Sequence, residues 1–467
     1  MLRYWNQTER DRESTGKLWQ KSDLVPGRLF SVAFVGLFLS ACETGVMPSL
    51  TTVTGREEAG GIIAADEPQA TIVAREILNA GGSAADGAAA LGFALTVTLQ
   101  SASGLGGGGL CTVFDAAQQR TEVLNFLPVP AISRRLSARW QVAVPTLARG
   151  LFALHAKYGK LPWQKVVVPA ENLARFGHSI SRAFARDVRQ SSAPLANDPK
   201  ALDTFMSSRR TMLEAGDRLT QLDLAATLGR IRARKPGDFY AGALARTMDE
   251  SALTSGASLA ADDLRVYSPS WHAPQTVRTG SSTLYIGTGG ISASMLSDAF
   301  SASIIKDKSF PYSSPHATGF IVADSGGNAV ACTLTMTEPF GLGLVLDGLG
   351  FLLSPAPGDG SGASTQLATL ISVDDSGEAV NFLAAAGGAE AIGVLAHLSR
   401  LTLTGQSFLK NNFPSALPVA TNNKELTRRA QANAAYCPNG LAEHLKDCLV
   451  SSDPAGMGYG LVAVGER

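Results

Sequence analysis

The sequence carries no excess of charge of either sign and no long apolar run. Charged residues make up 17% of the 467 residues, and 40 basic residues balance 40 acidic ones. A neutral chain offers no basic surface to attract phosphate backbones, so we expect no nucleic-acid partner. The most apolar run, residues 29–39, is far shorter than the roughly 20 residues that a membrane-spanning helix needs. We therefore expect no integral membrane protein.

Patterns that bind metals or phosphates are also lacking. The six histidines are scattered, and the five cysteines include no Cys-x-x-Cys pair, so the sequence predicts no metal site. The glycine run 104–109 follows a predicted helix, precedes a predicted strand and has no lysine nearby, which is the reverse of a phosphate-binding loop. Glycines in that place favour close approach of backbone to backbone or to a ligand. We expect neither a metal nor a cofactor.

The N-terminal region carries a targeting pattern. Its apolar run follows Arg28 and ends in Leu39-Ser40-Ala41-Cys42, which resembles the processing site of a bacterial lipoprotein. The resemblance implies that residues 1–41 are a leader, that Cys42 carries a lipid, and that residues 42–61 are a linker. Because Glu43 rather than Asp follows, it also implies the periplasmic face of the outer membrane. An ordinary cleaved secretory signal is the alternative interpretation.

Four further cysteines remain, and an oxidising periplasm would permit disulfides. Cys437 and Cys448 lie close together in a polar stretch, which predicts a local bridge between them. Cys111 and Cys332 lie in apolar, strand-like runs, so we expect them to be buried thiols.

Hydrophobic periodicity predicts strands toward both ends of the chain and helices in the middle. The expected strands are 62–64, 110–114, 121–126, 282–286, 318–323, 329–335, 350–353, 367–373 and 379–385. The expected helices are 67–79, 83–99, 147–158, 163–176, 180–190, 219–234, 240–253 and 389–404. Strand-rich ends around a helical middle are typical of an α+β body in which helices cover a sheet layer.

Several motifs occur together in one order. They include Gly-Gly-Ser-Ala-Ala-Asp-Gly-Ala-Ala-Ala at 81–90, the glycine run 104–109, Tyr-Gly-Lys-Leu-Pro-Trp at 158–163 and Asp-Ser-Gly-Gly-Asn-Ala-Val at 324–330. This combination resembles the γ-glutamyltransferase family, also called glutathione hydrolases. The resemblance covers about residues 62–404. It implies an N-terminal-nucleophile hydrolase fold, an α/β/β/α sandwich with a helical middle region.

The resemblance also divides the chain. Residues 62–316 correspond to the family's large subunit and residues 317–410 to its small subunit, whereas residues 411–467 resemble the family little. In that family the precursor cleaves itself, and a Thr at the new N-terminus attacks the γ-glutamyl carbonyl, its own amino group serving as base. Gly387 and Gly388 match the glycines whose N–H groups stabilise the oxyanion. A turn from strand to helix would require glycine there in any case.

The chain departs from the family at two reactive positions. Ala317 stands at the nucleophile position and has no hydroxyl. Thr318 matches the family's second Thr, but neighbouring strand residues face opposite sides, so it would face away from the site unless the register slipped by one. Leu127 stands where the family has an Arg that clamps the substrate α-carboxylate. A Leu cannot form that bidentate ion pair.

Other positions agree with the family. Thr335 matches a Thr that supports the nucleophile, and Thr337 replaces a substrate-contacting Asn. Asp359 falls on the Asp that holds the α-amino group, although an Asp among glycines is also typical of a turn. Ser364 and Thr365 match the paired serines at the substrate carboxylate.

Two functional interpretations follow. The first is an uncleaved, lipid-anchored periplasmic pseudoenzyme that uses the old pocket to bind a partner or a small γ-glutamyl-like or other amide ligand. The second is an active, divergent amidohydrolase that cleaves itself before Thr318. The sequence does not indicate the oligomeric state.

Overall fold

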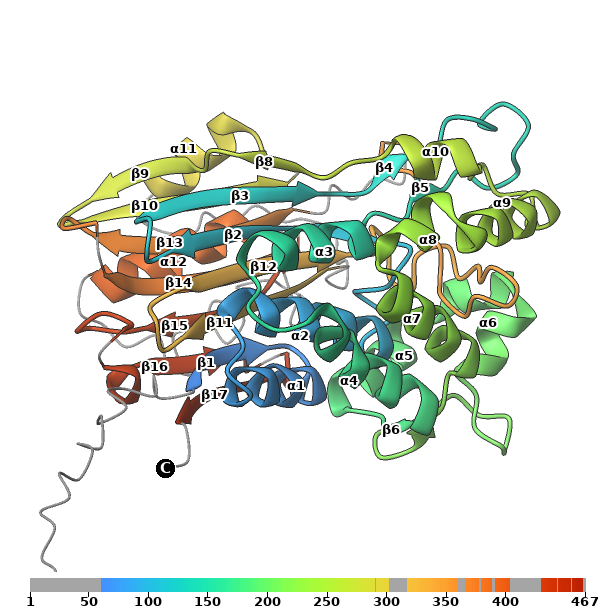
Figure 1. Cartoon of the computed structure of the whole chain (residues 1–467), viewed down its shortest axis with the longest axis horizontal. Helices are drawn as coiled ribbons and strands as arrows, with labels where there is room; N and C mark the ends of the chain where they lie inside the picture. Colours follow the sequence, from blue (N-terminus) through green and yellow to red (C-terminus); the bar gives the residue numbers. More distant parts are fainter. Residues whose placement is uncertain are drawn as a thin grey trace, which may run out of the picture. The chain divides into compact units, whose positions relative to one another are not determined.

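The computed structural model is drawn in Figure 1. It describes residues 60–289, 291–301, 317–358, 366–377, 379–388, 391–403, 430–442, 444–454 and 456–464. In this part of the chain, no helix is both long and apolar enough to cross a membrane.

A seven-stranded sheet forms one layer, and each pair of neighbouring strands in it is antiparallel. Its order is β17 (Tyr459–Val464), β1 (Gly60–Ala65), β11 (Ala317–Asp324), β12 (Ala329–Thr335), β2 (Gly108–Asp115), β3 (Arg120–Phe126) and β8 (Ser270–His272). The central strands β1, β11 and β12 are buried along their whole length, as strands covered on both faces must be.

A six-stranded antiparallel sheet forms the second layer. Its order is β16 (Leu449–Ser452), β15 (Ala430–Tyr436), β14 (Val380–Gly388), β13 (Leu367–Asp374), β10 (Ser282–Gly289) and β9 (Gln275–Thr279). Helices α11 (Ala293–Ser301) and α12 (Ala391–Leu403) contact each other, and α12 also packs on β13, β14 and β15. The prediction of an α/β/β/α sandwich is confirmed.

Strand alternation separates two apolar cores on either side of β11. Ile321 and Ala323 point toward the six-stranded sheet and join the core between the sheets. Phe320 and Val322 point the other way, into the core beneath the helices. Successive side chains of a strand project to opposite faces, so one strand supplies both cores. This alternation decides where each residue of the site lies.

Helices α1 (Pro68–Asn79) and α2 (Ala84–Thr98) cover the central strands of the seven-stranded sheet. In α1, the Glu67 carboxylate accepts the Ala70 N–H at 2.8 Å and caps the first turn. In α2 every residue is buried, and Ser83 and Asp86 form a capping box. A helix that is apolar all round must be enclosed, so α2 lies at the centre of the helical layer.

The helical middle follows, and Figure 1 shows it gathered beside the sheets. Its helices are α3 (Leu147–Tyr158), α4 (Trp163–Phe176), α5 (Arg182–Ser191), α6 (Pro199–Thr204), α7 (Leu222–Arg234), α8 (Pro236–Ala241), α9 (Ala243–Ser255) and α10 (Ala261–Val266). Short strands connect them: β4 (Val129–Pro130), β5 (Ala143–Val144), β6 (His178–Ser179) and β7 (Arg218–Leu219). Among the described residues, 3₁₀ turns also lie at Ala193–Asn197 in the helical middle and at Leu445–Asp447 near β16.

Most expected elements appear within a few residues of their predicted bounds, but one strand does not form. Residues 350–353 make only isolated bridges, Leu352 to Val345 and Leu353 to Gly106. Gly350 adopts a φ of +70°, and an added Cβ there would lie 2.3 Å from the Leu224 nitrogen. The left-handed backbone interrupts the extended conformation, so the apolar run Phe351–Leu353 becomes a packed loop.

The C-terminal region is part of both sheets, which the sequence did not indicate. Strand β17 pairs with β1 at the edge of the seven-stranded sheet, and β15 and β16 complete the six-stranded sheet. A disulfide joins Cys437 to Cys448 at this end of the body.

The interpretation of Cys111 and Cys332 as buried thiols was wrong. They occupy paired positions on β2 and β12 with their Cα atoms 4.1 Å apart, and they form a disulfide across the sheet. Apolar surroundings predict burial, but only strand pairing over 221 residues of sequence brings the two sulfurs together.

Candidate functional site

Ala317, at the expected nucleophile position, begins β11 and is 1% exposed. Its methyl group lies between the sheets beside Leu110 and Leu367, and Leu127 packs against these three residues. We call these four residues the Ala317 cluster. It contains no hydroxyl, carboxylate or guanidinium group, so it offers neither a nucleophile nor a charge to hold a substrate.

Gly387 packs directly against Ala317. A Cβ added to Gly387 would lie 2.6 Å from the Ala317 Cβ, so the sheets approach each other here only because position 387 is glycine. Its neighbour Gly388 donates its N–H to the Gln366 carbonyl at 3.0 Å. The structure thus brings Gly387, one of the two expected oxyanion glycines, against Ala317, whereas the N–H of Gly388 is already used within the protein.

Leu127 follows β3 and turns its side chain onto the Ala317 cluster. Its N–H donates to Asn125 Oδ1 at 3.0 Å, and Gly289 lies close enough that an added Cβ would touch the Leu127 methyl groups at 3.1 Å. The residue expected to replace the carboxylate clamp is therefore in the same cluster as the residue expected to replace the nucleophile. A carboxylate placed there would meet methyl groups instead of a guanidinium, which is costly.

Thr335 lies opposite Ala317 on β12 and is 4% exposed. Its Oγ1 accepts the N–H of Thr337 at 2.8 Å, and the Thr337 hydroxyl in turn accepts a hydrogen bond from Ser354 at 3.0 Å. Thr337 has a φ of +65°, which is unusual for a residue other than glycine. The two threonines thus shape the chain as it leaves β12.

The glycine run brings backbones together beside these threonines. A Cβ on Gly107 would lie 2.2 Å from the Thr335 carbonyl oxygen, and one on Gly106 would lie 2.1 Å from that of Leu352. Only glycine permits this approach.

Thr318 faces away from the Ala317 cluster, into the interior on the helical side. It is 1% exposed, and its hydroxyl donates to Asp66 Oδ2 at 2.8 Å. Asn433 donates to Asp66 Oδ1 at 2.9 Å and to the Gly319 carbonyl at 2.8 Å. We call Asp66, Thr318 and Asn433 the Asp66 network. It ties β11 to the residue after β1 and to β15 of the other sheet.

Burial raises the pKa of Asp66 to about 6, although the hydrogen bonds from Asn433 and Thr318 oppose this shift. Asp453 raises this pKa further, and Arg186 lowers it. The adjacent Glu67 is also buried, which raises its pKa to about 7. Two neighbouring carboxyl groups therefore titrate near neutral pH inside the fold.

The charges around the network extend to the glycine run. Arg186 on α5 donates to Asp187 Oδ1 at 2.9 Å and to the Gly456 carbonyl at 3.3 Å. Ser101 donates to Asp187 Oδ2 at 2.7 Å. These bonds connect Ser101, three residues before the glycine run, to the loop before β17.

No sequence motif indicated Asp66 or Asn433 as residues of the site. Asp66 directly follows a buried strand, and Gln431 and Asn433 alternate with alanines in Ala430-Gln-Ala-Asn-Ala434. That period of two could have marked β15 as a strand with polar side chains on its inner face. The partners on β1 and β11 would still have required the tertiary structure.

Four expected residues lie outside the described part of the chain. They are Cys42, Asp359, Ser364 and Thr365. Within the described ranges, no group of three or more His, Cys, Asp or Glu side chains could hold a metal ion.

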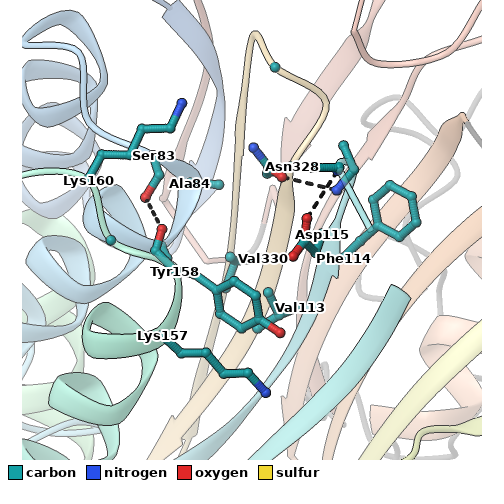
Figure 2. A pocket seen from close by; sticks show the side chains of 15 residues that line it. Ser83, Ala84, Val113, Phe114, Asp115, Lys157, Tyr158, Lys160, Asn328 and Val330 are labelled. Carbon is teal, nitrogen blue, oxygen red and sulfur yellow. Dashed lines mark hydrogen bonds between the residues drawn. The ribbon is translucent and has the colours of Figure 1, made fainter. Parts of the chain in front are cut away.

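A separate cleft lies at the other end of β11, beside the turn to β12. Its volume is about 490 Å³, and its lining includes Ser83, Tyr158 and Asn328. Figure 2 shows Lys157 and Lys160 on the Tyr158 side of the cleft, with Asn328 across from them. None of the residues expected from the sequence to bind substrate or react lines this cleft.

Comparison with known proteins identifies the relatives of the chain. The family model for Gamma-glutamyltranspeptidase matches residues 70–297. A glutathione hydrolase proenzyme of Pseudomonas aeruginosa is 27% identical over 379 residues, covering 63% of this chain and 67% of that protein. The Escherichia coli glutathione hydrolase proenzyme is 30% identical over 222 residues, 44% of this chain and 38% of that protein. The match thus spans well under half the length of the latter relative.

Among solved structures, a cephalosporin acylase from Bacillus halodurans aligns with a TM-score of 0.64 at 14% identity, covering 89% of this chain and 99% of that chain. At this identity the likeness concerns the fold alone. Together with the order of the strands and the sequence matches, these findings lead to one conclusion. The chain belongs to the γ-glutamyltranspeptidase family and has the N-terminal-nucleophile hydrolase fold.

Proposed function

We propose that this protein is a catalytically impaired member of the γ-glutamyltranspeptidase family. The observation that carries the proposal is the Ala317 cluster, which brings together Ala317 and Leu127, the residues that the resemblance aligns with the nucleophile and the carboxylate clamp. An isolated loss of the nucleophile would leave a charged clamp in the site. Here both positions are apolar and lie in one cluster, so a γ-glutamyl head group finds neither a reactive hydroxyl nor a partner for its carboxylate.

The ligand that we propose for this protein is a small amide that lacks an α-carboxylate at the usual place. The support is again Leu127, because an unpaired carboxylate in apolar surroundings would bind poorly. Calorimetric titration with γ-glutamyl amides and with matched amides without the α-carboxylate tests this selectivity. Tighter binding of the γ-glutamyl compounds would contradict it.

The first experiment is the intact mass of the purified protein. We expect one polypeptide, because Ala317 cannot begin the family's self-cleavage. We also expect hydrolysis of a chromogenic γ-glutamyl anilide at background rate. Two fragments, or hydrolysis that the wild-type chain catalyses well above background, would overturn the proposal.

A restoration experiment makes the test sharper. The double variant Ala317→Thr with Leu127→Arg supplies both missing groups, and we expect γ-glutamyl hydrolysis to rise at least tenfold above background. Ala317→Val with Leu127→Met is the matched control, because it changes volume at the same positions without adding reactive or charged groups.

The location that we propose is the periplasm, with Cys42 as the lipid anchor. The support is the segment Leu39–Cys42 and the presence of two disulfides, which are typical of oxidising compartments. Metabolic labelling with a fatty acid should mark the wild-type chain and not the variant Cys42→Ser. Equal labelling of both would exclude this anchor.

A second candidate function is self-cleavage before Thr318, followed by amide hydrolysis. The observation that favours it is the hydrogen bond from the Thr318 hydroxyl to Asp66. The pKa of Asp66 is raised to about 6, so at a higher pH its carboxylate is ionised and can accept a proton. Thr318 Oγ1 would attack the Ala317 carbonyl carbon, and its proton would pass to Asp66 and then to the Thr318 nitrogen as the peptide bond breaks. Water would then hydrolyse the ester, leaving a free amino group on Thr318.

The intact mass separates the two candidates. If the chain is cut before Thr318, the variants Thr318→Val and Asp66→Asn should remain single polypeptides while Thr318→Ser is still cut. A wild-type chain that stays whole at every pH between 5 and 9 excludes this second function.

A further inference from the structure

The connection between β4 and β5, residues 131–142, displays apolar side chains on the surface. Ile132 is 68% exposed and Leu136 is 105% exposed. Figure 1 shows this loop extending outward beside α9 and α10. Large aliphatic groups at the tip of a loop place apolar area in water and often mark a surface that meets another phase or molecule.

The loop is fixed to the helices behind it. Asp263 Oδ1 on α10 accepts the N–H groups of Ile132 and Ser133, each at 3.1 Å. Arg134 pairs with Asp249 on α9 and also donates to the Leu259 carbonyl at 2.8 Å. These bonds fix the base of the loop, so the loop is held in the conformation that exposes its apolar side chains.

Two further apolar side chains extend the same surface. Val266 is 77% exposed and lies one helical turn beyond Asp263 on α10. Leu253 is 63% exposed and lies one turn beyond Asp249 on α9. Residues three or four apart share a helix face, so both lie on the side that the loop contacts. We call Ile132, Leu136, Leu253 and Val266 the apolar corner.

The charge of the loop is of one sign. Residues 127–142 contain Arg134, Arg135 and Arg139 and no Asp or Glu. The Arg139 guanidinium lies over the Trp140 ring at 5.0 Å from its centroid. Surfaces that rest at the boundary between lipid headgroups and acyl chains typically combine aliphatic tips with flanking arginines and tryptophan. This loop has the same composition.

We propose that the apolar corner rests on a membrane surface, with Ile132 and Leu136 among the acyl chains and with Arg135 and Arg139 near anionic headgroups. Arg134 is paired with Asp249. Arg135 and Arg139 carry positive charge beside the aliphatic tip, and this charge complements anionic headgroups. This contact would orient the body on the membrane. It is independent of catalysis and does not require that Cys42 be acylated.

The test places a tryptophan at the tip. The full chain with Cys42→Ser is mixed with vesicles of phosphatidylglycerol and phosphatidylethanolamine that carry brominated acyl chains. The bromine atoms quench a tryptophan only when it lies at the depth of the acyl chains. For each variant we measure the fraction of the added tryptophan's fluorescence that is quenched. This fraction should be at least twice as large for Leu136→Trp as for Leu222→Trp, which is the control at an exposed leucine on α7. Equal quenching of the two added tryptophans would overturn the proposal.

A second measurement tests affinity. In flotation with the same lipids, Ile132→Ser with Leu136→Ser should reduce vesicle binding at least fivefold, while Leu222→Ser should leave it unchanged. Arg135→Gln with Arg139→Gln should reduce binding to anionic vesicles and not to pure phosphatidylcholine. If the double serine variant instead converts a dimer to a monomer in sedimentation, the surface contacts a second copy of the chain and the membrane proposal is wrong.

Discussion

The two faces of strand β11 differ in chemistry although they are one residue apart. On the face between the sheets, Ala317 meets Leu110, Leu127 and Leu367. On the opposite face, Thr318 donates its hydroxyl to the buried carboxylate of Asp66. The Thr318 hydroxyl is therefore on the side of the strand that holds the fold together, and the side on which the resemblance places the family's nucleophile carries the Ala317 methyl group. Adjacent residues of one strand can thus have opposite environments, because successive side chains project to opposite faces of the sheet.

The largest effect should come from the contact between Ala317 and Gly387. The variant Gly387→Ala brings two Cβ atoms to within 2.6 Å, so we expect the free energy of unfolding to fall by about 3 kcal/mol. Adding Ala317→Gly removes the clash and should restore most of that stability. Denaturant unfolding measures both variants, and failure of the second change to rescue the first would show that the two positions are not in contact.

Breaking the Asp66 network should be nearly as costly on the other face. Asn433→Ala removes donors from Asp66 Oδ1 and from the Gly319 carbonyl, leaving two buried acceptors without this partner. We expect the free energy of unfolding to fall by about 2–3 kcal/mol. Asn439→Ala, in which an exposed amide is lost, is the matched control and should change it little.

The pH dependence of stability should also distinguish the two faces. Because burial raises the pKa of Asp66 to about 6 from 3.8, the folded state binds a proton in this range that the unfolded state has lost. The contribution of Asp66 to the free energy of unfolding therefore rises by about 2 kcal/mol as the pH falls from 7.5 to 4.5.

The measurement is urea unfolding of the wild-type chain and of Asp66→Asn at several pH values. The difference between the two should shift in favour of the wild type as the pH falls. A difference that does not vary with pH would show that Asp66 titrates in the folded protein as it does in water. Burial also raises the pKa of Glu67, to about 7, so this group likewise increases stability as the pH falls. Because both chains contain Glu67, its effect cancels in the difference between them.

The smallest effect should follow loss of the Thr318 hydroxyl. Thr318→Val keeps the shape and removes one donor to Asp66, so we expect a loss of about 1 kcal/mol. Thr318→Ser keeps the donor and serves as the control. If the valine variant were as stable as the wild type, the network would hold β11 through Asn433 alone.

Much of the fold follows from local patterns in the sequence. The Ala-rich run at 84–98 becomes a buried helix, because it is apolar on every side and is capped by Ser83 and Asp86. The runs at 318–323 and 329–335 become paired strands, because short apolar runs bounded by a Gly-rich turn favour a hairpin. The run at 350–353 did not follow this rule, since a left-handed glycine and close backbone contacts fixed it as a loop.

The candidate site could be predicted only in part. The sequence identified Ala317, Leu127 and the paired glycines as positions of interest, because each departs from or matches a motif. It could not show that Ala317, Leu127 and Gly387 converge, or that the N–H of Gly388 is taken by Gln366. It also missed Asp66 and Asn433, whose hydrogen bonds span 252 and 367 residues of sequence.

By itself, the sequence determined the family, many of the helices and strands between residues 60 and 403, and the absence of a hydroxyl at position 317, because each of these depends on residue identity and local periodicity. The tertiary structure decided that Cys111 joins Cys332, that β15 to β17 complete both sheets, and that Thr318 belongs to a buried structural network. These outcomes depend on which strands become neighbours. That choice is made by the burial of whole strand faces, which no short stretch of sequence contains.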